Sequence, residues 1–301
     1  MILTDLLPSW ELALQASNKS PGTITSYLDT AKRLAAYLAS ERQELDAPGI
    51  RAFLAAERDR TTAASAAKHY RNLSVYFGWL LAEGEIGDNP MTRVEKPKVP
   101  EAVKPFFSED ELSALLKTTK GQDFEARRDH AIIRILIDTG VRVRGLADLR
   151  YDPADDDATD VFLAQRWLRV RLKGGDTWRV PIGNQTAAAL DRYLRVRARS
   201  PHSASPWLWI GTRGHKVQHF SDSGIRQMLA RRGEQAGIQN CNPHRFRHTF
   251  ADQWLAYGGN VDDLMNVAGW KSIAMPLRYA KGRGMARAAE AHRRLSPGDR
   301  L

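Results

Sequence analysis

The sequence predicts a mainly α-helical protein with one small β-hairpin or sheet, an α+β fold arranged in two domains. Apolar residues recur at helical spacing over most of the chain. Residues 167–182 instead alternate apolar and polar side chains, as strands do. A proline-rich stretch without periodicity, residues 88–105, separates residues 1–87 from residues 106–301. We therefore expect two domains joined by a linker of extended character.

Length and composition limit the class of protein. The chain has 301 residues, which is enough for two domains of ordinary size. Its single cysteine, Cys241, excludes an internal disulfide and a cysteine-based zinc site, and it favours a cytoplasmic setting. The most apolar helical segment, residues 131–137, is short and carries Arg134. We therefore expect neither a signal peptide nor a membrane span.

The net charge of +10 is unevenly distributed. Residues 1–100 hold 12 Lys and Arg against 12 Asp and Glu, whereas residues 101–301 hold 33 against 23. Cationic side chains that neutralise phosphates release counterions, so a polyanion is the expected partner of the C-terminal half. The composition leaves open the alternative of a basic protein without such a partner.

The N-terminal domain is expected to be entirely helical. Apolar spacing predicts helices over residues 2–18, from Ser20 to 38, over 48–57 and over 61–83, the last ending at Gly84. The last helix carries basic and hydroxyl side chains near its start, a composition suited to a DNA major groove. These residues are Thr61, Thr62, Ser65, Lys68, His69 and Arg71. A solvated helix face is the alternative interpretation.

The first half of the C-terminal domain begins with a capping box. Ser108 and Glu111 predict a helix that runs to about residue 118, and a second helix over 125–139 ends at Gly140. The acidic residues 152–160 lack the glycine and terminal glutamate of a calcium loop, so we expect a solvated turn. The alternating residues that follow predict a hairpin with Lys173 at its tip.

Basic residues mark the second half of this domain. Helices are predicted over 186–198 and 221–236, with a short apolar segment at 207–211 and a tail helix over 286–295. Candidate DNA contacts in this half are Arg213, Lys216, Arg226, Arg231 and Arg232. Surface salt bridging is the alternative for the arginines of the second helix.

The stretch from Cys241 to Tyr279 holds the densest cluster of chemistry-bearing side chains. Pro243 suits the first turn of a helix, so His244 and Arg247, three residues apart, should share one face and could hold a phosphate. A short helix follows, with Asn260 as its N-cap and Gly269 as its terminator.

Beyond that helix come two aromatic residues. Trp270 lies just past its end, and Tyr279 lies between Arg278 and Lys281, where a phenol could meet an electrophile in a cationic setting.

In this order and context, six residues resemble the catalytic set of the tyrosine recombinase (phage integrase) family. The six are Arg142, Lys173, His244, Arg247, Trp270 and Tyr279. The resemblance covers essentially the whole chain and is strongest from Phe107 to Tyr279. It implies a helical N-terminal domain that clasps DNA from the side opposite a catalytic domain. It also implies cutting and rejoining of DNA at a specific recombination site, for integration, excision or multimer resolution.

The resemblance assigns a role to each residue of the set. Tyr279 would form a 3′-phosphotyrosine link, and Lys173 would protonate the leaving 5′ oxygen. Arg142, Arg247 and Trp270 would hold the phosphate, while His244 would assist proton movement. No ATP, metal or other cofactor is expected. Four protomers would assemble on double-stranded DNA as a homo-tetramer, with a hetero-tetramer as the alternative.

One position departs from the family pattern. Members commonly carry a glutamate three residues after the first arginine, where this chain has Gly145. Asp148, one helical turn further along, is a candidate to replace it. Two alternative functions stay open on the sequence: a type IB topoisomerase that relaxes supercoils as a monomer, and a catalytically silent DNA-binding protein on the same fold.

Overall fold

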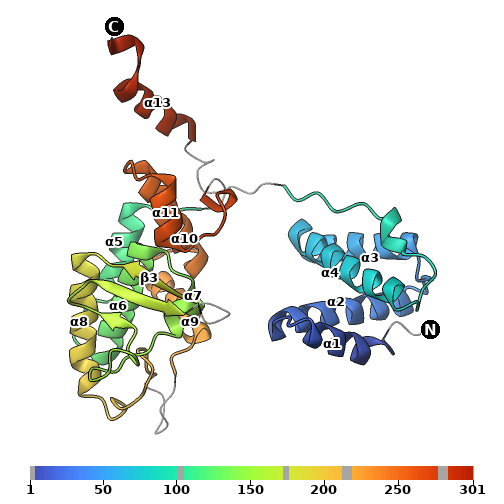
Figure 1. The fold of residues 1–301 in the computed structure, drawn as a ribbon, viewed down its shortest axis with the longest axis horizontal. Helices are drawn as coiled ribbons and strands as arrows, with labels where there is room; N and C mark the ends of the chain where they lie inside the picture. The colour runs from blue at the N-terminus through green and yellow to red at the C-terminus, as the bar shows by residue number, and fades with distance from the viewer. Residues whose placement is uncertain (1–3, 101–104, 172–175, 212–218, 277–283, 301) are drawn as a thin grey trace. The chain divides into compact units, whose positions relative to one another are not determined.

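The chain divides into two compact units, Met1–Ala102 and Val103–Leu301. A computed structural model describes residues 4–100, 105–171, 176–211, 219–276 and 284–300. Figure 1 shows the helices of each unit and a single small sheet in the C-terminal unit. The predicted fold class, mainly α with a small sheet, is confirmed.

Within the described residues, the N-terminal unit holds four α-helices. They are α1 Leu7–Ala16, α2 Pro21–Ser40, α3 Ala47–Arg60 and α4 Ala63–Ala82. The side chains of Ser20, Asp46 and Thr62 cap the last three by accepting a backbone N–H of the first turn. The four predicted helices are confirmed, with Gly84 in the left-handed region at φ 75° just after α4.

The apolar stripes of these helices meet in one core. Trp10, Leu34, Phe53 and Leu73, one from each helix, are at most 1% exposed. The start of the predicted linker differs from the expected extended chain. Residues Pro90–Arg93 form a 3₁₀ helix, and Met91 within it and Val94 just after it are buried in this core. Asn89 caps that helix, a local signal that apolar periodicity does not register.

A polar network crosses the same unit beside the core. Asn72 of α4 donates to Thr30 of α2, and Thr30 Oγ1 lies 3.0 Å from His69 Nδ1. His69 Nε2 lies 3.3 Å from Glu57 of α3. Burial lowers the pKa of His69, against the opposing effect of the Glu57 carboxylate. His69 therefore faces inward and does not belong to the outer basic surface with which the sequence grouped it.

The C-terminal unit is built around α6 (Phe124–Thr139), which packs against both α8 and α10. Residues 131–133, 135 and 136 of α6 are fully buried. The other helices described here are α5 Glu109–Lys117, α7 Val143–Ala147, α8 Asn184–Ala198, α9 Asp222–Gln235, α10 Pro243–Ala256, α11 Val261–Ala268 and α13 Gly284–Leu295. The capping box of Ser108 and Glu111 is confirmed, as is the tail helix.

The sheet has three antiparallel strands in the order β1, β2, β3. They are β1 Val161–Phe162, β2 Trp167–Arg171 and β3 Thr177–Pro181. The predicted hairpin is confirmed, with Leu168 opposite Val180 and Val170 opposite Trp178. The two-residue strand β1 was not predicted, because two residues are too few to show alternation.

The acidic segment that precedes the sheet is more ordered at its end than the sequence indicated. Asp160 is fully buried, although we expected it in a solvated turn. Its Oδ1 accepts from Arg169 Nε and Arg171 Nη2, each at 3.0 Å, and its Oδ2 accepts the backbone N–H of Arg150. The correction follows from the strand register, which brings two arginines of β2 over one carboxylate.

Two absences apply to the described residues. Within them, no helix combines the length and the apolar composition needed to cross a membrane. Nor do any three His, Cys, Asp or Glu side chains in these ranges group as a metal site would require.

Candidate active site

Helix α10 carries two residues of the predicted site, His244 and Arg247. Pro243 occupies its first turn, as predicted, and Asn242 caps it by accepting the backbone N–H of Arg245. His244 is exposed at the start of the helix. Arg247, three residues on, is 4% exposed.

Arg247 is held by several contacts. Its Nη1 donates to the Gly140 carbonyl at 2.8 Å and its Nη2 to the Ala268 carbonyl at 2.9 Å. Its guanidinium carbon lies 4.8 Å from the centre of the Trp270 ring. Both carbonyls belong to the last turns of helices, where the dipole favours a cation. The arrangement therefore fixes a guanidinium at the meeting point of α6, α10 and α11.

The bond from Arg247 to the Gly140 carbonyl also involves the segment that leads to Arg142. Gly140 ends α6 in the left-handed region at φ 55°, and a Cβ there would lie 2.9 Å from the Phe250 ring. Two residues later Arg142 is the N-cap of α7, with an exposed side chain. The backbone that leads to Arg142 is thus bonded directly to Arg247.

Gly145 has a structural reason. A Cβ at this position of α7 would lie 2.7 Å from Val170 Cγ1 of β2, too close for any carbon contact. The close packing of α7 on the sheet therefore requires glycine. The sequence alone does not reveal this, because the clash is with a residue that is distant in the sequence. Asp148, the candidate replacement for a glutamate, lies 3.5 Å from Arg144 Nε instead.

Trp270 follows α11 in a fixed position. Asn260 caps this helix and Gly269 ends it at φ 63°, both as predicted. The backbone N–H of Trp270 donates to the Met265 carbonyl, and its side chain is 5% exposed in a cluster with Phe250 and Leu264. Trp270 is thus buried against α10 rather than left on the surface.

The entry into the C-terminal unit is fastened to α10. Arg245 Nη2 donates to the Phe106 carbonyl at 2.8 Å and to both carboxylate oxygens of Glu111, at 2.6 and 2.7 Å. The backbone N–H of Phe107 donates to Thr249 Oγ1 at 2.9 Å. Arg245 therefore has a structural role, although it lies between two predicted site residues.

Four of the predicted residues lie outside the described residues. They are Lys173, Arg213, Lys216 and Tyr279. For Lys173, the structure describes both flanking strands, β2 and β3.

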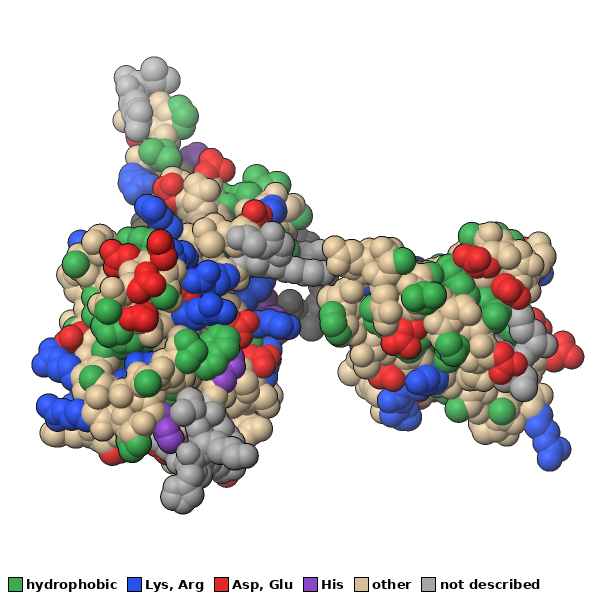
Figure 2. All heavy atoms as spheres, turned by 60° about the horizontal axis from the view of Figure 1, so that its bottom comes forward, with side chains coloured by type: hydrophobic (Ala, Val, Ile, Leu, Met, Phe, Trp, Pro, Cys, Tyr) green, Lys and Arg blue, Asp and Glu red, His purple; other side chains and the backbone are tan. Residues whose placement is uncertain are grey.

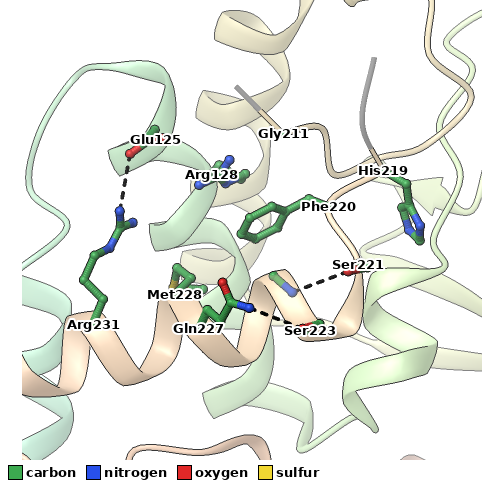
Figure 3. A pocket seen from close by; sticks show the side chains of 11 residues that line it. Glu125, Arg128, Gly211, His219, Phe220, Ser221, Ser223, Gln227, Met228 and Arg231 are labelled. Carbon is green, nitrogen blue, oxygen red and sulfur yellow. Dashed lines mark hydrogen bonds and ion pairs between the residues drawn. The ribbon is translucent and has the colours of Figure 1, made fainter. Parts of the chain in front are cut away.

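The remaining DNA-contact candidates fall into two groups. Lys68 and Arg71 of α4 and Arg226 of α9 are exposed. Arg231 is also exposed, but its Nη2 lies 3.1 Å from Asp129 and its Nη1 lies 3.7 Å from Glu125. The Glu125 pair borders the pocket of about 400 Å³ in Figure 3, between α6 and the start of α9. Arg232 also pairs with the fully buried Asp129.

Cationic side chains are concentrated on the C-terminal unit. Figure 2 shows Lys and Arg gathered on this unit's visible face, whereas the N-terminal unit shows them in smaller number. This agrees with the net charge of +10, all of which arises in residues 101–301. The exposed arginine at Arg142 and the fixed one at Arg247 are suited to hold a phosphodiester through its non-bridging oxygens.

Comparisons with known proteins extend the picture. Residues 105–283 match the model of the phage integrase family. Tyrosine recombinase XerC of Pelobacter propionicus is 26% identical over 284 residues, covering 92% of this chain and 90% of that protein. Tyrosine recombinase XerD of Listeria monocytogenes serotype 4b is 27% identical over 258 residues, covering 84% and 82%. A lambda integrase tetramer bound to a Holliday junction superposes with a TM-score of 0.73 at 18% identity, covering 94% of this chain and 78% of that one.

Proposed function

The chain belongs to the phage integrase family and is a site-specific tyrosine recombinase, and we propose that it cuts DNA with Tyr279. The observation that supports this proposal is the junction around Arg247. One guanidinium contacts the backbone beside Arg142 and stacks on Trp270. Three segments that are distant in the sequence, around Arg142, Arg247 and Trp270, are thereby brought into contact, as the family resemblance implies.

The proposed reaction is an in-line displacement at a backbone phosphate. The phenolic oxygen of Tyr279 attacks phosphorus, the bond from phosphorus to the 5′ oxygen breaks, and a 3′-phosphotyrosine forms. Lys173 donates a proton to the 5′ oxygen, and His244 assists proton movement at the phenol. Attack by a 5′ hydroxyl on the phosphotyrosine reverses the step and rejoins DNA.

Arg142, Arg247 and the indole N–H of Trp270 would stabilise the charge that develops on the non-bridging oxygens. Preorganised donors of this kind each contribute about 10²–10³-fold in rate in other enzymes. Arg247 meets the requirement of preorganisation, because its two carbonyl contacts and its stacking orient the guanidinium before DNA arrives. Holding the bond energy in the covalent link makes a nucleotide cofactor unnecessary.

The proposed partner is double-stranded DNA with a specific recombination site, bound by four copies of this chain. The lambda integrase neighbour is a tetramer on a Holliday junction, which supports this assembly. Lys68 and Arg71 of the N-terminal unit and Arg226 of the C-terminal unit are the proposed phosphate or groove contacts. Affinity should fall steeply with salt while sequence preference is kept.

A nicked suicide duplex that carries the recombination site tests the nucleophile. The wild-type chain should form a covalent adduct that survives denaturation, and Tyr279→Phe should form none. Tyr257→Phe is the matched control, because Tyr257 is 74% exposed in the same unit and should leave adduct formation unchanged. Adducts that persist in Tyr279→Phe would exclude the assignment.

The other two functions considered from the sequence are not favoured. The relatives are Xer recombinases, which favours neither a topoisomerase nor a silent DNA-binding protein. Plasmid relaxation and the suicide duplex separate them experimentally. A topoisomerase would relax plasmids that lack the site, and a silent protein would bind the site without forming an adduct.

A further inference from the structure

Trp178 of β3 connects the sheet to the end of α11. Its indole N–H donates to the Asn266 carbonyl at 2.9 Å. A Cβ at Gly269 would lie 2.9–3.0 Å from the Trp178 ring, so the ring packs directly on the glycine that ends α11. The glycine is required here twice, by this contact and by its φ of 63°.

The residues on either side of Gly269 hold Arg247. The carbonyl of Ala268 accepts a hydrogen bond from Arg247 Nη2 at 2.9 Å, and Trp270 stacks with the guanidinium. Ala268 and Trp270 thus contact Arg247, and Gly269 between them contacts Trp178. Movement of this short segment would move one carbonyl and one ring that orient the arginine.

Trp178 is in turn supported by the neighbouring strand. It pairs across the sheet with Val170, which is 2% exposed and packs on Gly145 of α7. The face of the hairpin that bears Val170 and Trp178 is therefore fixed between α7 and α11. Because β2 and β3 are paired along this face and Val170 packs on α7, the face supports the end of α11.

We propose that Trp178 is a positioning residue for Arg247, acting through Gly269 and the Ala268 carbonyl. The proposal deepens the proposed function, since it depends on Arg247 stabilising the negative charge of the scissile phosphate. Loss of the ring lets the end of α11 shift toward the space it leaves. A displacement of about 1 Å in a positioned group costs on the order of 10²-fold in rate.

The test compares two suicide duplexes that differ only at the scissile linkage. One carries the ordinary phosphodiester and the other a methylphosphonate, in which a methyl group replaces one non-bridging oxygen. In both, the Tyr279 oxygen bonds to phosphorus and the bond to the 5′ oxygen breaks. The methylphosphonate is neutral and develops one negative charge fewer, so it requires less stabilisation by arginine.

Trp178→Ala should slow adduct formation on the phosphodiester about 10–100-fold, with a much smaller loss, within about threefold, on the methylphosphonate. Arg247→Ala should show the same pattern with a larger loss. Trp178→Phe, which keeps a ring on Gly269 but loses the bond to Asn266, should fall between Trp178→Ala and the wild type. The matched control is Trp167→Ala on β2, where the ring stacks on Phe162 and is remote from α11 in the strand register.

Equal losses of Trp178→Ala on both linkages, or no loss on either, would overturn the proposal. Recovery of adduct formation by Trp178→Ala only on a duplex with sulfur at the 5′ bridging position would also overturn it. A thiolate leaves without a proton donor, so the defect would then lie in general-acid catalysis. If Arg247→Ala slowed adduct formation equally on both linkages, the role of Arg247 in the proposed function would be refuted as well. If the methylphosphonate restored adduct formation in Arg247→Ala but not in Trp178→Ala, only the positioning role of Trp178 would be refuted.

Discussion

Replacing Gly145 tests how tightly α7 is packed on the sheet. The added Cβ of Gly145→Ala would lie 2.7 Å from Val170 Cγ1. Relaxed carbon contacts are about 3.5–4.0 Å, so one side must move by roughly 1 Å. Val170 is β-branched and 2% exposed, which leaves it little freedom to rotate away.

The expected loss follows from two opposing effects. Overpacking of a core costs about 1–3 kcal/mol. Alanine in place of glycine within a helix gains roughly 0.5–1 kcal/mol. Gly145→Ala should therefore lower the free energy of unfolding by about 0.5–2 kcal/mol. The same clash means that Gly145→Glu, which restores the family's usual residue, should not raise the rate of DNA cleavage.

A double-mutant cycle measured by urea unfolding checks the reasoning. Val170→Ala alone should cost about 2 kcal/mol, from two lost methyl groups and the space they leave. Combined with Gly145→Ala, the total loss should be smaller than the sum by about 1 kcal/mol or more, because the new methyl occupies that space. Additive losses, or a stabilising Gly145→Ala, would refute the packing argument.

Three further predictions concern charge. Burial, with a smaller effect from Arg134, lowers the pKa of His130 to about 4, below its usual 6.5. The unfolded chain therefore binds a proton that the fold excludes, and the free energy of unfolding should fall as the pH is lowered from 6.5 toward 4. Urea unfolding of His130→Gln should show a shallower pH dependence; an unchanged slope would contradict this. Asp160→Ala leaves two arginines without their carboxylate and should cost about 2–3 kcal/mol by thermal or urea unfolding, below the 3–5 kcal/mol of a fully buried pair because Arg171 is 39% exposed; a loss under about 0.5 kcal/mol would contradict it. Arg247→Lys loses the contact of the guanidinium with the Trp270 ring and one carbonyl contact, so adduct formation should fall at least about tenfold while gel-shift affinity for the site changes little; an equal fall in both would argue for a binding role.

Local signals in the sequence were sufficient for most helix ends. Ser108 and Asn260 accept the backbone bonds expected of N-caps, Pro243 lies in the first turn of α10, and Gly269 has the positive φ expected of a terminator. These predictions depend only on neighbours within four residues. The alternation that predicted β2 and β3 is local in the same sense.

Contacts between distant segments could not be predicted in this way. Asp160 looked solvated because its sequence neighbours are acidic, and only the strand register places arginines over it. The packing of Trp178 on Gly269 joins positions 91 residues apart, and the hydrogen bond from Arg247 to Gly140 spans 107. The family resemblance named Arg247 as a phosphate-holding residue, but the structure shows what orients it.

The bonds of Arg245 anchor the entry of the polypeptide into the C-terminal unit. Where the polypeptide enters the C-terminal unit, Phe106, Phe107 and Glu111 are tied to Arg245 and Thr249 of α10. Phe106 and Phe107 are therefore anchored on α10 before the chain begins α5. The segment that leads into this unit is thus attached to the helix that carries His244 and Arg247.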